Sequence, residues 1–167
     1  MKKFAAAICL VALAALAVGS DPDEKTVCAI DRFLTAWHHA AAVADAEIYF
    51  GSLAPGAVFL GTDARERWTK EEFQAWSAPY FKRPSAWTFT ASRRQVYLAA
   101  GGNTAWFDED LVSTSYWPCR GSGVLERVAG QWRIRQYNLA LTIPNEATAA
   151  VKPLVEAALQ QQAAAGK

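Results

Sequence analysis

The apolar pattern of this chain changes once, near Pro84, and this change limits the folds that the chain can adopt. Before Pro84 the apolar residues recur at helical spacing. From there to Pro144, Trp, Thr, Val, Tyr and Phe alternate with polar residues, as they do in strands. Helices followed by a meander of strands are typical of an α+β domain with an antiparallel sheet.

The first half of the chain contains three predicted helices. The first begins near Asp21 and has one apolar face, because its apolar residues recur every three or four positions. This stripe consists of Val27, Ile30, Leu34, Trp37, Ala41 and Ala44. A short helix at 45–50 and a strand at 57–60 follow. A capping-box pattern, Thr with Glu three residues later, predicts a third helix that begins at Thr69 and runs through Tyr80.

Four strands are predicted in the second half, at 87–98, 104–115, 121–127 and 132–142. Gly101-Gly102-Asn103 and Ala129-Gly130-Gln131 are predicted hairpin turns, because Gly and Asn tolerate positive φ. On the last strand, alternation places Trp132, Ile134, Gln136, Asn138 and Ala140 on one face and Arg133, Arg135 and Tyr137 on the other. We expect the first of these faces to line a pocket.

The N-terminus has the three parts of a secretory signal. A basic start at Met1-Lys2-Lys3 precedes an apolar run at 4–18 and the small residues Gly19-Ser20. The apolar run is too short for a membrane span, although a buried helix is an alternative. We therefore predict a signal peptide at 1–20, a domain at 21–146 and an Ala-rich tail at 147–167. The mature protein is expected to be periplasmic or secreted, with no membrane attachment.

Charge and cysteine content exclude several function classes. The net charge of +1 gives no indication of a nucleic-acid partner. Cys28 and Cys119 remain after removal of the signal, and no cluster of His or acidic residues beside them suggests zinc. The two thiols could pair in an oxidising compartment, but we expect both to be free. The chain contains no phosphate-binding loop and no nucleophile elbow, and we predict neither a metal nor a cofactor.

Several segments resemble the SnoaL-like group of the nuclear-transport-factor-2-like superfamily. They are Ala57-Val58-Phe59-Leu60-Gly61-Thr62-Asp63, Glu66-Arg67-Trp68-Thr69-Lys70-Glu71-Glu72-Phe73, Pro79-Tyr80-Phe81, Ala105-Trp106-Phe107-Asp108-Glu109, Arg120-Gly121-Ser122-Gly123-Val124-Leu125, Trp132-Arg133-Ile134 and Gln136-Tyr137-Asn138-Leu139. The resemblance covers roughly residues 27–145. It implies an α+β cone, in which N-terminal helices pack on the concave face of a curved antiparallel sheet. It names no activity, because one fold hosts many functions.

Trp37, Trp68, Trp106 and Asn138 are the predicted pocket wall, and Asp63 lies where a strand ends at the mouth. Asp63 and Glu66 either line this entrance or serve only as a turn cap and an exposed side chain. His38 borders the apolar stripe of the first helix, whereas His39 lies nearly opposite. His38 is therefore either a boundary residue or a general base.

The three consecutive acids at 108–110 are the strongest local indication of a functional or structural charge site. Alternation places Asp108 and Asp110 on one face of a strand and Glu109 on the other, so at least one acid points inward. Because an unpaired buried charge is costly, we expect Arg120 on the neighbouring strand to be its counterion. Either this pair is a structural salt bridge, or Asp108 or Glu109 is a catalytic base whose pKa is raised by burial.

Three functions remain open. The first is binding of a small apolar molecule without catalysis. The second is a cofactor-free isomerase or dehydratase that uses a pocket acid or His38 for proton transfer. The third is a homodimeric interaction module whose sheet is the interface.

Overall fold

The computed structural model describes residues 22–165, and the predicted signal segment at 1–20 lies outside them. Its elements, in chain order, are α1 (Pro22–Ala42), α2 (Ala46–Gly51), β1 (Leu53–Leu60), β2 (Arg67–Thr69), α3 (Lys70–Ser77), β3 (Thr90–Leu98), β4 (Thr104–Val112), β5 (Cys119–Val128), β6 (Gln131–Leu141), the 3-10 turn η1 (Asn145–Ala147) and α4 (Thr148–Ala165). The predicted α+β class, with helices preceding a curved sheet, is confirmed.

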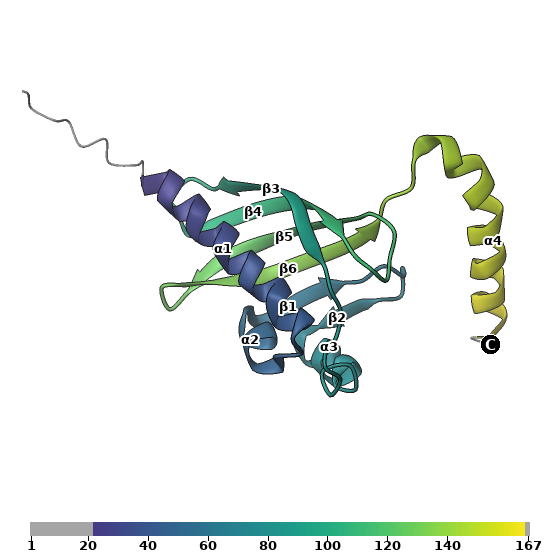
Figure 1. Cartoon of the computed structure of the whole chain (residues 1–167), viewed down its shortest axis with the longest axis horizontal. Coiled ribbons are helices and arrows are strands. Elements are labelled where there is room, and N and C mark those ends of the chain that lie inside the picture. Colours follow the sequence, from purple (N-terminus) through teal and green to yellow (C-terminus); the bar gives the residue numbers. More distant parts are fainter. Residues whose placement is uncertain (1–21, 166–167) are drawn as a thin grey trace, which may run out of the picture.

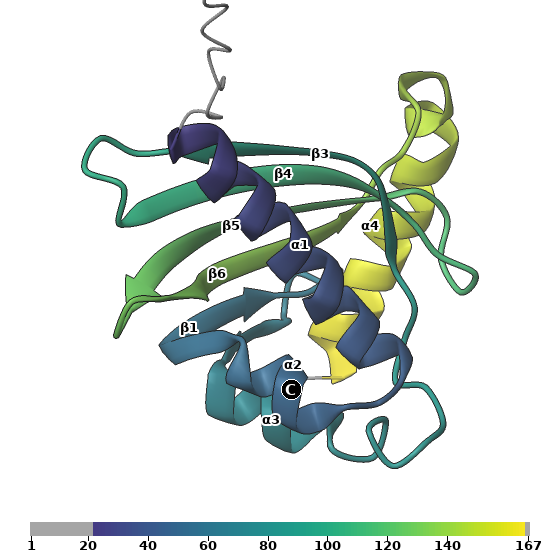
Figure 2. The same cartoon turned by 60° about the vertical axis from the view of Figure 1, so that its left-hand side comes forward.

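The six strands form one sheet in the order β2-β1-β6-β5-β4-β3. Neighbouring strands are antiparallel except β1 and β6, which run parallel, so the sheet is mixed rather than purely antiparallel as expected. The β1–β6 pairing is possible because helix α3 and the whole β3–β5 meander lie between these two strands in sequence. Helix α1 crosses one face of the sheet (Figures 1 and 2).

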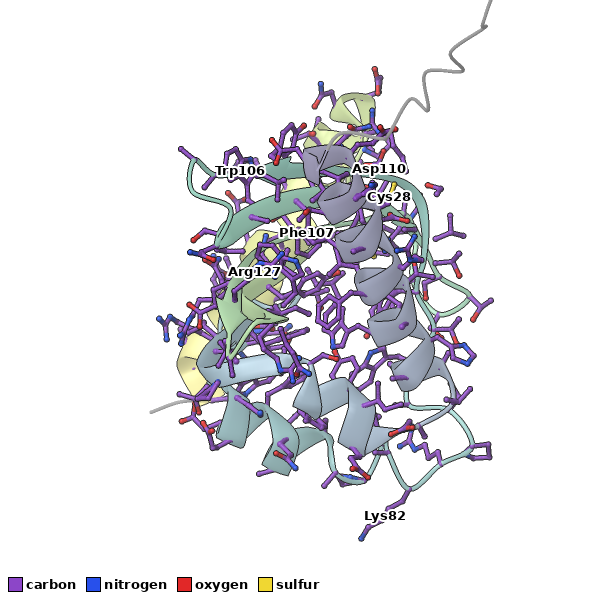
Figure 3. The ribbon with its side chains drawn as sticks, turned by 90° about the vertical axis from the view of Figure 1, so that its left-hand side faces the viewer. Cys28, Lys82, Trp106, Phe107, Asp110 and Arg127 are labelled. Atoms are coloured by element: carbon purple, nitrogen blue, oxygen red, sulfur yellow. The ribbon has the colours of Figure 1, made fainter. Side chains whose placement is uncertain are left out.

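Packing of α1 on the sheet forms the core. Ile30, Leu34, Trp37 and Ala41 of the predicted stripe are all buried. The alternate residues Ala105, Phe107, Glu109 and Leu111 of β4 face them, while Trp106 and Asp110 point to the other side (Figure 3). This alternation follows from the pleat of the strand.

The predicted turns and cap are present, and one helix is shorter than expected. Ala129 and Gly130 have φ of 49° and 79°, which suits a tight turn between β5 and β6. The Thr69 hydroxyl accepts from the backbone of Glu72, and the Glu72 side chain accepts from the backbone of Thr69. Helix α3 ends at Ser77 rather than Tyr80. Ala78 still has helical dihedral angles, but Pro79 has no backbone N–H with which to continue the i→i−4 hydrogen bonds.

A β-bulge in β6 changes which residues of that strand point inward. Val124 pairs with Gln136, and the next residue, Leu125, pairs with Ile134, so Arg135 is an extra residue without a partner on β5. Trp132 and Ile134 are buried before the bulge, whereas Tyr137 and Leu139 are buried after it. The single face predicted for this strand was therefore wrong beyond Ile134.

Helix α4 extends beyond the end of the sheet (Figure 1), and none of its residues is buried. Its Gln162 amide lies 3.3 Å from Asp63 Oδ2. Within the described residues, no helix is long and apolar enough to cross a membrane.

Candidate functional site

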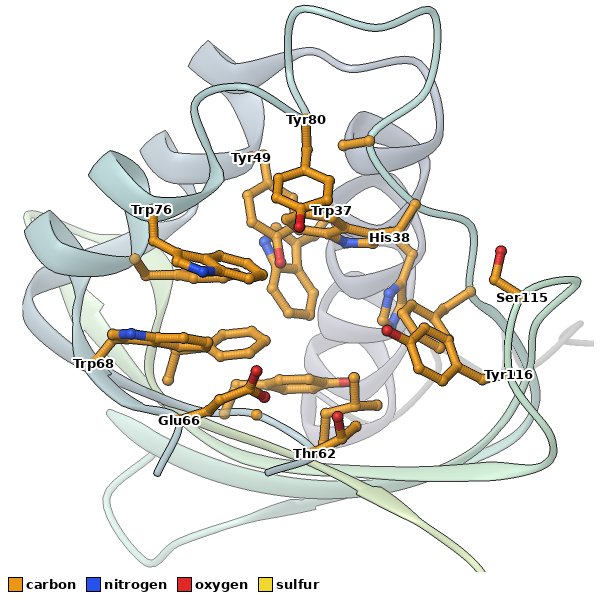
Figure 4. Close-up of a pocket in the computed structure, with 18 of the residues that line it drawn as sticks. Trp37, His38, Tyr49, Thr62, Glu66, Trp68, Trp76, Tyr80, Ser115 and Tyr116 are labelled. Atoms are coloured by element: carbon orange, nitrogen blue, oxygen red, sulfur yellow. The ribbon is translucent and has the colours of Figure 1, made fainter. Parts of the chain in front are cut away.

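A cavity of about 450 Å³ opens beside α1, between the end of β1, the α3 region and the loop that follows β4. Most of its wall is aromatic (Figure 4). These aromatic residues are Trp37, Tyr49, Phe59, Trp68, Phe73, Trp76, Tyr80, Trp87, Phe89, Tyr116 and Tyr137. Such a wall favours a flat apolar ligand, because aromatic rings supply large contact areas at fixed geometry.

Many of these rings stack on one another, which fixes the shape of the wall. The Phe59 and Phe73 centroids are 4.0 Å apart, and the Trp68 and Trp76 centroids are 4.8 Å apart. Aromatic pairs in proteins are worth about 0.5–1.5 kcal/mol beyond the area they bury. The side of the cavity near α3 is therefore preorganised.

A buried acid lies behind the opposite wall. Glu109 is only 1% exposed, and three side chains bind its carboxylate. The Nε2 atom of His38 lies 2.8 Å from Oε1, the Tyr137 hydroxyl donates to the same oxygen over 2.9 Å, and Arg94 Nε donates to Oε2 over 2.8 Å. Of these four side chains, those of His38 and Tyr137 also line the cavity.

Arg94 connects this acid to helix α1. Its Nη1 donates to the carboxylate and the carbonyl of Asp31 over 2.8 and 3.0 Å, and to the Thr35 hydroxyl over 3.0 Å. The Arg94 side chain is 4% exposed, and its Nη2 is buried without a partner in the described part of the chain. A fixed, buried guanidinium thus neutralises a fixed, buried carboxylate.

The network also fixes protonation states. Burial alone would raise the pKa of Glu109, but its hydrogen bond and charge interaction with His38, together with Arg94, outweigh burial and lower it. Burial, followed by the negative charge of Glu109, raises the pKa of Tyr137 well above its ordinary value. Near neutral pH, Glu109 is therefore a carboxylate and Tyr137 a neutral donor.

Gly121 makes room for this network on β5. It pairs with Glu109 across β4 and β5. A Cβ atom at this position would lie 2.3 Å from the Tyr137 hydroxyl and 2.7 Å from Glu109 Oε1. Any larger residue would displace both groups, so this glycine is a steric requirement of the site.

Residues 30–144 match the SnoaL-like domain family, which is more than half of the chain. The protein belongs to this family. No curated protein matches the chain. Solved structures that are less than 25% identical to this chain share its fold, but this similarity does not assign an activity.

Three of these structures illustrate the fold. An NTF2-like protein of unknown function from Pseudomonas putida KT2440 is 14% identical with a TM-score of 0.60, covering 74% of this chain and 91% of its own. A proposed ketosteroid isomerase from Parabacteroides distasonis ATCC 8503 is 18% identical with a TM-score of 0.56, covering 69% and 86%. A proposed scytalone dehydratase from Novosphingobium aromaticivorans DSM 12444 is 12% identical with a TM-score of 0.57, covering 70% and 83%.

Several residues predicted from sequence lie at the cavity of this SnoaL-like domain. Trp37, His38, Glu66 and Trp68 line it. Glu109 is the inward acid, as alternation allowed. His39 is exposed. Both Cys28, which is exposed, and Cys119, which is buried, are free thiols.

Other predicted site residues lie elsewhere. Trp106 is 47% exposed and stacks on Tyr97 outside the cavity, with centroids 5.6 Å apart. Asp108 shares that outer side of β4, because Glu109 takes the inner one. The bulge at Arg135 turns Asn138 away from the cavity and turns Tyr137 inward.

The predicted counterion was also wrong. Arg120 contacts Asp110 at 3.5 Å on the outer side of the sheet, and both side chains are well exposed. Asp63 forms an ion pair with Arg65 and does not line the cavity. This pair, chiefly through the hydrogen bond from the Arg65 side chain, lowers the pKa of Asp63 to about 2.

Sequence reasoning missed Arg94 and Tyr137. The Arg93-Arg94 pair could have been noticed, because alternation requires one of two adjacent arginines in a strand to point inward. Among the residues that the structure describes, no group of three His, Cys, Asp or Glu side chains could hold a metal ion.

Proposed function

We propose that this SnoaL-like domain binds a small, flat and largely apolar molecule in its cavity. This proposal rests on the preformed cavity of about 450 Å³ with its stacked aromatic wall. Small-molecule sites are commonly concave, mostly apolar and equipped with a few placed polar groups. The fold similarity to proposed isomerase and dehydratase structures supports a small organic ligand.

Filling the cavity tests this proposal. Ala86 lines the cavity, whereas Ala75 is exposed on α3 and does not line it. Calorimetry with naphthalene as the probe should show binding to the wild type and to Ala75→Trp, but not to Ala86→Trp. Equal binding to both variants would place the ligand site elsewhere, and no binding to the wild type would refute the proposed binding function.

A second candidate function is cofactor-free proton transfer by His38. The buried Glu109 carboxylate supports it, because a carboxylate on one imidazole nitrogen stabilises the charge that forms when the other nitrogen takes a proton. His38 would act as the base and Glu109 as its orienting partner. Arg94 and Tyr137 would keep Glu109 ionised and in place.

Hydrogen exchange on an apolar ketone tests this second function. Proton NMR in D₂O would follow loss of the α-hydrogens of 2-tetralone with the wild type, His38→Phe and Asp108→Asn. A positioned general base contributes roughly 10²–10⁴-fold. We expect His38→Phe to lose that factor and Asp108→Asn to retain it, because Asp108 lies on the outer side of β4. Equal rates in all three would exclude His38 as the base.

We also propose that the protein is exported, on the basis of the basic start and the short apolar run at 4–18. The intact mass of protein isolated from its native source should lack that run. A full-length intracellular product would contradict export.

A further inference from the structure

Several polar groups of the cavity wall near α1 are already bonded or buried. The Tyr137 hydroxyl donates to Glu109, and the Tyr49 hydroxyl interacts with Trp87. The Trp37 indole Nε1 has no partner among the described residues, but it is fully buried and therefore out of reach of a ligand. Apart from Tyr137, His38 is the lining side chain that binds the buried Glu109 (Figure 4). The other polar side chains of the wall are Thr62, Glu66, Tyr80, Arg83, Ser115 and Tyr116.

One nitrogen of the His38 ring is hydrogen-bonded within the protein, and the other has no partner among the described residues. Nε2 lies 2.8 Å from Glu109 Oε1. Glu109 is ionised and can only accept, so Nε2 must carry the hydrogen. In neutral His38, Nδ1 then carries a lone pair. Nδ1 binds no described residue and is not among the buried, unpartnered atoms, so it is accessible from the cavity.

We infer that the cavity selects ligands that donate a hydrogen to His38 Nδ1, namely hydroxylated or N–H-bearing aromatic compounds. This inference rests on the proposed binding function. An ether, ketone or carboxylate oxygen at this position would place its own lone pair against the lone pair of Nδ1, so no hydrogen bond could form. Leaving a buried polar group unpaired costs roughly 1–3 kcal/mol, which corresponds to about 5- to 150-fold in affinity.

Three matched probes measure this selectivity: 2-naphthol, which donates, 2-methoxynaphthalene, which only accepts, and naphthalene, which does neither. At pH 7.5, calorimetry on the wild type should show 2-naphthol binding at least about 5-fold more tightly than the methoxy compound. His38→Phe should lose this preference and bind 2-naphthol and the methoxy compound with similar affinity. Nitrogen-15 NMR of the wild type should show hydrogen on Nε2 and none on Nδ1.

Glu109→Gln should shift the preference toward the methoxy compound. Arg94 has only donors, so the Gln oxygen must face Arg94 and the Gln NH₂ must face His38 and Tyr137. His38 Nε2 then accepts, and the ring hydrogen moves to Nδ1. The cavity now presents a donor, and the methoxy compound should bind more tightly relative to 2-naphthol than in the wild type.

The outcomes separate the inference from the function on which it rests. If naphthalene fails to bind the wild type, the proposed binding function is wrong. If naphthalene binds but the wild type shows no preference for 2-naphthol, or if NMR places the hydrogen on Nδ1, binding stands and the selectivity is overturned. The wild-type measurements decide the inference even if a variant fails to fold.

Discussion

Two neighbouring acids on β4 form two very different pairs with two neighbouring arginines on β3. Glu109 pairs with Arg94 on the inner side of the sheet, where the side chains are 0% and 4% exposed. Asp110 pairs with Arg93 on the outer side, where the side chains are 36% and 62% exposed. The N–O distances of 2.8 and 2.9 Å are nearly equal. Burial, rather than distance, distinguishes the two pairs.

This difference shows that the pleat of a strand determines the environment of an ion pair. A residue shifted by one position changes face, and the same ion pair moves from water to a low-dielectric interior. In the interior, removal of one partner leaves the other charge unsolvated. On the exposed side of the sheet, water replaces the lost partner. The inner pair can therefore hold His38 in one tautomer, and the outer pair has no comparable consequence.

The largest expected effect is that of Arg94→Met. It leaves Glu109 buried without its cation, and breaking a buried pair in this way costs about 3–5 kcal/mol. Urea unfolding measures the loss. Arg93→Met is the matched control, because it makes the same substitution one residue away on the exposed pair, where about 0–1 kcal/mol is expected. Equal losses in the two variants would refute the contrast between the faces.

The next expected effect is that of Tyr137→Phe. It removes one of the three hydrogen bonds to the Glu109 carboxylate and leaves the packing of the ring intact. A hydrogen bond to a charged group contributes roughly 1.5–3 kcal/mol. Thermal unfolding should show a loss in this range. An unchanged stability would mean that the phenol contributes only packing.

Much of this contrast follows from the sequence. The helical stripe, the Thr69 cap, the two hairpin turns and the inward acid all depend on local periodicity or turn chemistry. The strand with 108–110 had to point one acid inward, whatever its partners were.

The partners could not be predicted, because they depend on register. Arg135 is an extra residue in β6, and nothing in the local pattern shows that the strand changes face there. Arg94 reaches Glu109 because β3 pairs with β4 in a register that places these two residues opposite each other. The parallel β1–β6 pair joins strands far apart in sequence, which no local pattern specifies.

The pH dependence of stability should also distinguish the inner acid. The pKa of Glu109 is lowered in the folded state, so its stabilising contribution is complete above its ordinary pKa, roughly 4.3, and is lost as the pH falls through the lowered value. The difference in unfolding free energy between wild type and Glu109→Gln should therefore shrink on acidification below roughly pH 4.3. Urea unfolding from pH 7 to pH 3 measures it. A difference that stays constant over this range would show that the pKa is not lowered by folding.

The smallest expected effect is that of Arg120→Leu. Its guanidinium lies 3.5 Å from Asp110, the two side chains are 57% and 36% exposed, and Arg93 also binds that acid. Water and Arg93 can replace what Arg120 provides, so the unfolding free energy should change by about 0–1 kcal/mol. Urea unfolding of Arg120→Leu in the wild-type and Arg93→Met backgrounds measures this. A loss near that of Arg94→Met would require Arg120 to reach the buried acid, and would reverse the assignment of the two faces of β4. A modestly larger effect in the Arg93→Met background would instead show that the two exposed arginines substitute for each other at Asp110.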